Sequence, residues 1–240
     1  MLLQAFALTP VGAKGFDEEV IQVDPTTIDS TQRETVGAFG LKNLISTDGK
    51  GAFVFEPTKV KFNKDLRRYE TERRDWVKGE VFQFLASQIL DNHHLYVFSV
   101  DAENKLTIHW PPDARWQETD KRTIANYAPD IGQKPVSAVI LSADIALTLP
   151  SPEEGLQVNT VGEDHLIVLV STKPLSDFRQ RLNLFKNTEG GVSKRLNTVF
   201  GDVLTPFDKI SYQKDKMMVR HKTQETQGWV VPMVLSIPVK

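Results

Sequence analysis

The fold is decided by three apolar runs: Val81-Phe82-Gln83-Phe84-Leu85, His94-Leu95-Tyr96-Val97-Phe98-Ser99-Val100 and Lys105-Leu106-Thr107-Ile108-His109-Trp110. Each has the length of a β-strand and is rich in aromatic and β-branched residues. Four residues ending in Asn104 separate the second run from the third, a spacing that is typical of a β-hairpin. Asparagine also tolerates the positive φ that closes such a loop. We therefore expect three strands here, the last two of them paired.

The simplest hairpin register places Leu95 opposite Trp110 and Val97 opposite Ile108, on the face that meets the core. The other face then carries aromatic and histidine side chains, and a tryptophan follows in the next connection. These residues form a candidate partner-binding face: His94, Tyr96, Phe98, His109 and Trp116. The alternative is burial, with the same face serving as a platform for helices later in the chain.

Strand patterns recur at residues 39–45, 52–55, 139–141, 145–149, 165–171, 216–221 and 229–237. The run 165–171 is apolar without interruption, as expected of a strand that is covered on both faces. Two helices are predicted within residues 176–205, the first capped by Ser176. Their apolar stripes are Phe178, Leu182 and Phe185, then Val192, Leu196, Val199, Phe200 and Val203. We expect a mainly β (α+β) fold, an antiparallel β-sandwich or barrel-like sheet with two short helices late in the chain.

Composition divides the chain into two parts. Residues 1–37 are polar over most of their length and predict an extended or flexible arm. Their first residues are apolar, which is compatible either with an ordinary first strand or with a trimmed signal peptide. Residues 38–240 predict a single β-rich domain. Within it, residues 64–76 interleave basic and acidic side chains in almost equal number, a pattern typical of a solvated face.

The overall composition excludes several classes of function. The 240 residues contain no cysteine, which excludes cysteine proteases, thiol oxidoreductases and iron–sulfur proteins. A net charge of -2 gives no electrostatic footprint for nucleic acid. No apolar run approaches the ~20 residues that cross a bilayer, so we expect a soluble chain without a membrane span.

Catalytic and metal-binding motifs find little support. Ser99, His109 and Asp101 are the residue types of a hydrolytic triad, but the chain lacks the Gly-x-Ser-x-Gly elbow that exposes the nucleophile. His94 and His109 share a face in the predicted register, yet strand histidines are more often packing residues than zinc ligands. Gly49-Lys50-Gly51 lacks the remainder of a phosphate loop. We expect no catalytic residue, metal or cofactor.

The middle of the chain resembles the bacterial domain family of unknown function DUF4384, over about residues 70–176. The matching elements are Lys78-Gly79-Glu80, Leu95 through Asp101, Asn104-Lys105-Leu106, Trp110-Pro111, Leu149-Pro150, and Gly162 through Ser171. The resemblance implies a bacterial accessory module of the kind found beside caspase-like peptidases, kinases and secreted or periplasmic proteins. The family has no agreed catalytic activity, so the resemblance supplies no site residues.

These observations favour a non-catalytic β-rich binding or accessory module for another protein or a neighbouring domain. A glycan is a further candidate partner, because the aromatic residues would also suit one. The alternative is a hydrolase, directed at peptides or glycans, whose motif is not recognisable. The sequence leaves the compartment and the identity of the partner open.

Overall fold

The computed structural model describes residues 33–47, 52–89, 93–111, 139–141, 147–151, 153–223 and 228–240. These residues belong to one compact unit, Gln32–Lys240. The first strand begins at Arg33, so residues 33–37, which composition places in the arm, belong to a sheet. The rest of the predicted arm lies outside the described residues.

Sheet A has the strand order β10-β5-β1-β13-β12, with β2 paired to β1 and β9 paired to β5. Its strands are β1 (Arg33–Thr47), β2 (Phe53–Pro57), β5 (Val81–Ile89), β9 (Leu147–Leu149), β10 (Leu156–Gln157), β12 (Ser211–Tyr212) and β13 (Met217–Thr223). All of these pairings are antiparallel. The long β1 is the axis of the sheet, because it pairs with β5 along one edge and with β13 and then β2 along the other.

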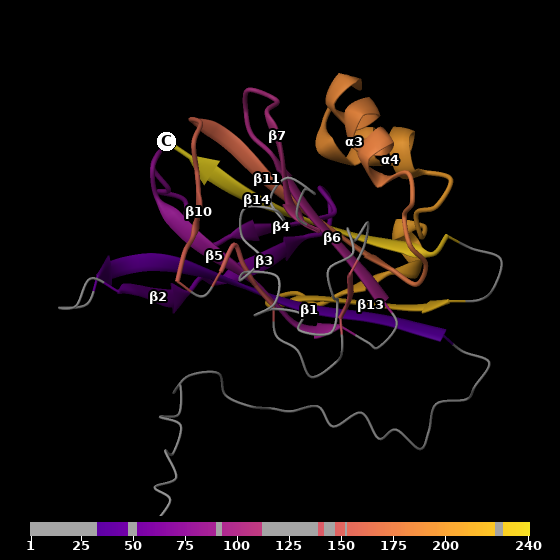
Figure 1. Ribbon diagram of the computed structural model, residues 1–240, viewed down its shortest axis with the longest axis horizontal. Coiled ribbons are helices and arrows are strands. Elements are labelled where there is room, and N and C mark those ends of the chain that lie inside the picture. The colour runs from indigo at the N-terminus through magenta and orange to yellow at the C-terminus, as the bar shows by residue number, and fades with distance from the viewer. Residues whose placement is uncertain are drawn as a thin grey trace, which may run out of the picture. The chain divides into compact units, whose positions relative to one another are not determined.

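Sheet B has the order β3-β4-β14-β11-β6-β7, with β8 paired to β6. Its strands are β3 (Val60–Asn63), β4 (Arg68–Thr71), β6 (His93–Val100), β7 (Leu106–Trp110), β8 (Val139–Leu141), β11 (Gly162–Ser171) and β14 (Val230–Val239). β14 pairs with β4 in parallel and with β11 in antiparallel fashion. Two open sheets packed face to face confirm the predicted sandwich and exclude the barrel (Figure 1).

The central strand β11 is buried on both faces, as predicted. Leu166, Val168 and Val170 enter the core between the two sheets. Ile167 and Leu169, which point the other way, enter a second core on the outer face of sheet B. Because side chains alternate along a strand, an unbroken apolar run is what a doubly covered strand requires.

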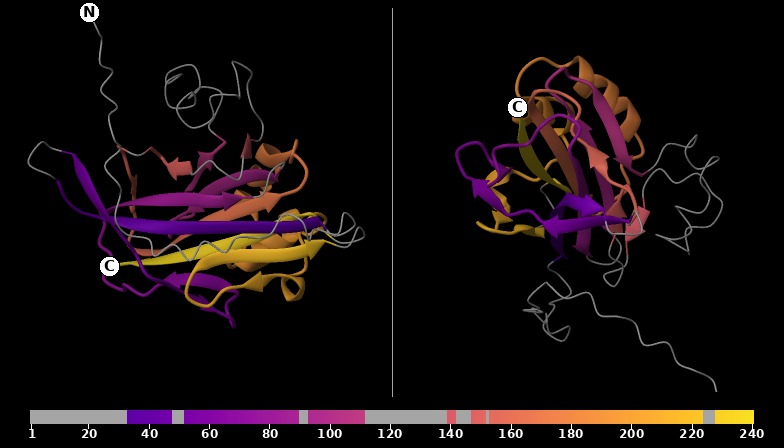
Figure 2. Two further views of the ribbon diagram at one scale, coloured as in Figure 1. Left: turned by 90° about the horizontal axis from the view of Figure 1, so that it is seen from below. Right: turned by 90° about the vertical axis from the view of Figure 1, so that its left-hand side faces the viewer.

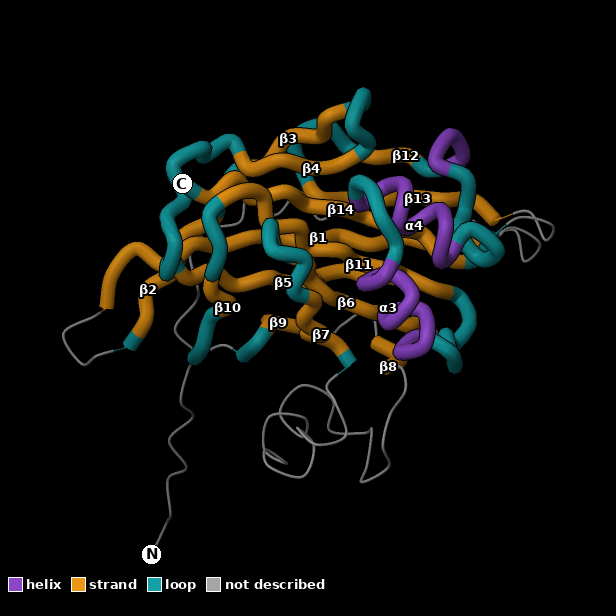
Figure 3. Tube along the Cα trace, turned by 90° about the horizontal axis from the view of Figure 1, so that it is seen from above, coloured by secondary structure: helices purple, strands orange, loops and turns teal. Residues whose placement is uncertain are grey.

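The second core lies beneath the helices α3 (Phe178–Asn187) and α4 (Val192–Phe200), which cover the outer face of sheet B (Figure 3). The predicted apolar stripes of both helices are buried. The prediction that Ser176 caps α3 is wrong, since the N-cap residue is Asp177 and no side chain caps it. A short 3-10 helix, η3 (Phe207–Lys209), follows. Among the described residues, no helix is long and apolar enough to cross a membrane.

The hairpin β6–β7 is confirmed, but its register differs from the simplest one. Val97 pairs with Trp110 and Phe98 with Ile108, with an irregularity between them. A β-bulge of this kind inserts one extra residue into one strand, so the two faces of β7 do not follow strict alternation. The loop closes as expected, with Asn104 at a φ of 63°.

Residues 64–76 are more than a solvated face. They contain β4, in which Tyr69 and Thr71 are buried, and they end near Trp76, which is buried as well. The charged Arg68 and Glu70 alternate with the buried pair and point outward from sheet B. Residues 64–76, with their mixed charges, therefore include a strand whose outward residues are charged and whose inward residues are buried.

Candidate functional site

The aromatic residues of the candidate partner-binding face are not exposed. Tyr96 and Phe98 both have 0% exposure. Their rings contact Phe178 and Phe185 of α3, with centroid separations between 4.6 and 6.0 Å. The interpretation in which this face is a platform for the late helices is therefore correct, and the interpretation as an exposed aromatic surface is wrong. Trp116 lies outside the described residues.

The bulge also separates the two histidines of that face. His94 stays on the helix side of sheet B, opposite Ser171 of β11. The Nε2 atom of His109 lies 2.8 Å from the Oγ atom of Ser99, whose cross-strand partner Leu166 belongs to the core between the sheets. His94 and His109 consequently do not share a face. The described residues contain no cluster of three or more histidine or acidic side chains that would hold a metal ion.

The triad residue types are only partly brought together. Ser99 and His109 form a hydrogen bond, but the carboxylate of Asp101 has other partners. Its Oδ1 accepts the backbone N–H groups of Glu103 and Lys105, and its Oδ2 accepts the hydroxyl of Thr160. Burial lowers the pKa of His109 to about 4, so this imidazole is neutral at pH 7.

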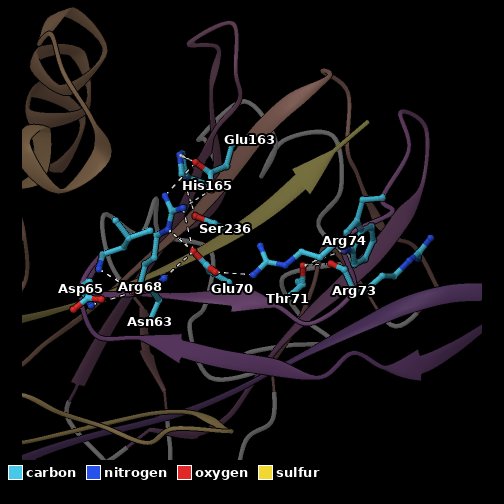
Figure 4. A network of polar contacts seen from close by, with 12 residues as sticks. Asn63, Asp65, Arg68, Glu70, Thr71, Arg73, Arg74, Glu163, His165 and Ser236 are labelled. Carbon is cyan, nitrogen blue, oxygen red and sulfur yellow. Dashed lines mark hydrogen bonds and ion pairs between the residues drawn. The ribbon is translucent and has the colours of Figure 1, made fainter.

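A network of polar side chains that no local sequence pattern indicates crosses the outer face of sheet B (Figure 4). We call it the Arg68 network; it comprises Arg68, Glu70, Arg74, Glu163, His165 and Ser236. Arg68 of β4 donates to both carboxylate oxygens of Glu163 at the start of β11, at 2.6 and 3.1 Å. This fork-to-fork contact joins residues 95 positions apart in the chain.

The charges of the network are balanced by their neighbours. Burial works to raise the pKa of Glu70, but hydrogen bonds from Arg74 and Arg68 outweigh it and hold that pKa below its usual value. Burial is the main cause that lowers the pKa of His165 to about 4; the carboxylate of Glu163 opposes this shift. The neutral imidazole places its Nδ1 atom 2.8 Å from the Oγ atom of Ser236.

Ser236, His165 and Glu163 therefore lie in the order of a serine–histidine–acid triad. The geometry differs from that of a catalytic one, because Ser236 contacts the Nδ1 atom of the imidazole rather than Nε2. Ser236 is also only 1% exposed, which closes its hydroxyl to a substrate. The arrangement can hold β11, β14 and β4 in register, and it offers no accessible nucleophile.

One end of the Arg68 network opens into a pocket of about 390 Å³, which we call the α3–α4 pocket. Its walls are the β6–β7 turn, the start of β11, the loop from α3 to α4 and the first turn of α4. Glu163 and His165 contribute from the sheet, and Arg195 contributes from α4. The volume lies in the range of small-molecule sites.

A second candidate surface is the hairpin at one end of sheet A, which we call the β1–β2 arm: residues 42–47 of β1 with β2. The arm extends past the other strands of the sheet (Figure 2). Ile45 and Phe53 are 46% and 45% exposed. Among the described residues, β2 pairs with β1 alone, so the backbone groups along its other edge lack a strand partner.

Neither surface could be identified from local sequence patterns. The pocket combines elements that lie far apart in the chain, and the exposure of the arm depends on how the other strands pack. No family model, curated protein or solved structure matches the chain, so the resemblance to DUF4384 stays a prediction.

Proposed function

We propose that this protein is a non-catalytic binding module for another protein or a neighbouring domain, and that the β1–β2 arm is its binding surface. The observation that carries the proposal is the exposed apolar edge: Ile45 and Phe53 are close to half exposed on a strand pair whose outer edge pairs with no strand in the part of the chain that the structure describes. Natural proteins usually cover, shorten or charge such edges, because an open apolar edge pairs with other chains.

The chemistry of the arm fits an extended segment of a partner polypeptide. Backbone N–H and C=O groups along β2 are suited to pair with an added strand, which supplies affinity without regard to sequence. The rings of Phe53 and Phe55, 6.1 Å apart and nearly perpendicular, add an apolar contact that favours aliphatic or aromatic partner side chains. The base of the arm is anchored, since Thr58 donates from its backbone N–H to the carbonyl oxygen of Leu41 and from its hydroxyl to Asn43.

The alternative, a hydrolase, gains less support. Its best candidate nucleophiles are Ser99, whose hydroxyl is hydrogen-bonded to His109 without Asp101 in line, and Ser236, which is buried. A panel of generic peptidase, esterase and glycosidase substrates tests it directly. Turnover by the purified chain that is abolished by Ser99→Ala or Ser236→Ala would replace the binding proposal with the hydrolase.

The binding proposal is tested by placing the photo-crosslinking residue p-benzoylphenylalanine at position 53 in the cells that produce the protein. The matched control carries the same residue at position 184, because Leu184 is 60% exposed and lies on α3, outside the arm. We expect one defined polypeptide to crosslink from position 53 and not from position 184, through an extended apolar segment.

The crosslinked polypeptide is then purified and its affinity is measured directly. Phe53→Lys should weaken binding about tenfold or more, because it removes an aromatic anchor and places a charge at the edge strand, whereas Leu184→Lys should leave it unchanged. Equal affinities for the wild type and Phe53→Lys would contradict the assignment of the arm.

A further inference from the structure

The α3–α4 pocket contains a buried cation, Arg195, that has no counter-ion within the described part of the chain. Arg195 is 6% exposed. Its Nε and Nη2 atoms donate to the carbonyl oxygen of Phe185, at 2.9 and 2.6 Å, and its guanidinium lies 4.0 Å from the centre of the Phe185 ring. No carboxylate of the described residues forms an ion pair with it.

A guanidinium has five N–H donors, and the contacts with one carbonyl oxygen leave part of this fork available to the pocket that Arg195 lines. Burial lowers the pKa of Arg195, which reflects the cost of holding a charge out of water. An anion that binds in the pocket would offset that cost, since a buried charge is stabilised by pairing.

The first turn of α4 meets the same pocket. Gly191 is the N-cap residue, no side chain caps the helix, and the first turn contains no acidic residue. The uncapped N–H groups and the helix dipole favour a negative group at this end. Gly190, with a φ of 108°, and Gly191 have no side chains to block the approach, and Lys186 adds a second cation from α3.

The acidic groups of the pocket limit the charge of the ligand. Glu163 is paired with Arg68, and the carboxylate of Asp101 accepts hydrogen bonds from its own turn and from Thr160, but the negative charges of Asp101 and Glu189 still line the wall. A multiply charged anion would be repelled by these two carboxylates. A ligand with one negative charge and with hydrogen-bond donors elsewhere suits both sides of the pocket.

We propose that the α3–α4 pocket binds a small carboxylic acid that also carries amino or hydroxyl groups, with its carboxylate against Arg195 and the N-terminus of α4 and its donors toward the carboxylate of Glu189. Planar guanidinium groups recognise carboxylates through paired hydrogen bonds, which gives this class its preference. The site is separate from the β1–β2 arm and does not depend on it.

The test is an NMR titration of the full chain with glycine, L-serine and lactate, with ethanolamine and inorganic phosphate as comparison probes. We expect saturable shifts of the Gly190, Gly191 and Val192 amides with at least one of the three carboxylates. Ethanolamine, which lacks the carboxylate, should give none, and phosphate should bind more weakly. Phosphate binding tighter than every carboxylate, or no saturable shift up to about 20 mM of any carboxylate, would overturn the proposal.

Three variants locate the bound carboxylate. Lys186→Ala and Arg195→Gln should each weaken binding about tenfold, the effect of losing a charge-assisted contact. Lys216→Ala removes an exposed cation in the turn just before β13, outside the pocket, and should leave the affinity unchanged.

Gly191→Asp tests the same anion position without removing the buried Arg195, so it can be measured even if Arg195→Gln fails to fold. A Cβ atom at Gly191 would meet no atom within 4 Å, so the position has room for a larger residue, and an aspartate there would cap α4 and occupy the anion position from within the chain. We expect its melting temperature to rise while carboxylate affinity falls about tenfold. Gly191→Ala should retain affinity. Gly191→Asp that binds as tightly as Gly191→Ala would overturn the proposal.

Discussion

The hydroxyl of Tyr96 accepts a hydrogen bond of 2.6 Å from the backbone N–H of Leu175, 79 residues later in the chain. This bond fixes the segment that leads into α3 against the outer face of sheet B. The Tyr96 ring also packs on Phe178, with 4.6 Å between the ring centroids. The strand β6 is therefore a docking platform for the protein's own helices, and the two proposed binding surfaces lie elsewhere, at the pocket and the arm.

Truncating that platform should destabilise the fold. Phe98→Ala removes a fully buried ring that contacts both Phe178 and Phe185, so we expect the free energy of unfolding to fall by about 3–5 kcal/mol. Urea unfolding followed by circular dichroism measures the change. The matched control is Phe53→Ala on the exposed arm, which should cost less than about 1 kcal/mol. Equal costs at the two positions would mean that the helices do not dock on β6.

The helix stripe can be tested in the same way. Leu196 is fully buried in the second core, so Leu196→Ala should lower the free energy of unfolding by about 2–5 kcal/mol. Lys194, two residues earlier, is exposed, and Lys194→Ala should change it by no more than about 0.5 kcal/mol. Similar small effects at both positions, measured by chemical unfolding, would show that α4 is not packed on the sheet.

The Arg68–Glu163 contact should be energetically coupled. A double-mutant cycle with Arg68→Ala and Glu163→Ala isolates the pair, and we expect a coupling of about 1 kcal/mol, because Glu163 is partly exposed and water screens the charges. The coupling should shrink in 1 M salt. A control cycle pairs Arg68→Ala with Asp202→Ala, whose carboxylate contacts Arg181, and should give none. Additive effects in the first cycle would show that the contact does not hold β4 and β11 together.

The sequence predicted the elements whose apolar periodicity is regular. The unbroken run 165–171 and the stripe of Phe178, Leu182 and Phe185 are both buried as expected. The spacing of apolar residues in these two elements follows from the geometry of a single strand or helix, so it can be recognised in one sequence. The predicted elements also specified which class of architecture they form, because strands with one apolar face have few ways to cover it.

The remainder depends on contacts between distant residues. β4 is hidden in a charged stretch because Arg68 and Glu70 point outward, where they meet Glu163 from another strand and Arg74. The bulge that brings His109 beside Ser99 has no local signature in the sequence. The pocket joins the N-terminus of α4 to the β6–β7 turn, which lies about 90 residues earlier in the chain, so its residues share no motif.

The stability of the fold should depend on pH through His109. Its pKa is lowered from 6.5 to about 4 by burial, so the folded protein favours the neutral ring. A histidine whose pKa is depressed on folding contributes its full stabilisation above pH 6.5. That contribution is lost as the pH falls from 6.5 to 4, since the unfolded chain binds a proton that the folded chain does not. We expect a loss of about 1–3 kcal/mol across this window.

Asp164 changes the stability with pH in the opposite direction, so its contribution has to be separated from that of His109. Burial, together with the charge of Asp101, raises its pKa from 3.8 to about 6, so protonating it stabilises the fold as the pH falls through 6 toward 3.8. The wild type is therefore compared with His109→Gln and with Asp164→Asn by urea unfolding at pH 7 and pH 4.5. The advantage of the wild type over His109→Gln should shrink at the lower pH, because only the wild type carries the histidine. Over the same interval Asp164→Asn should lose stability more steeply than the wild type does. A constant difference between the wild type and His109→Gln would mean that this imidazole titrates alike in the folded and unfolded chains and that it is not shielded from water beside Ser99.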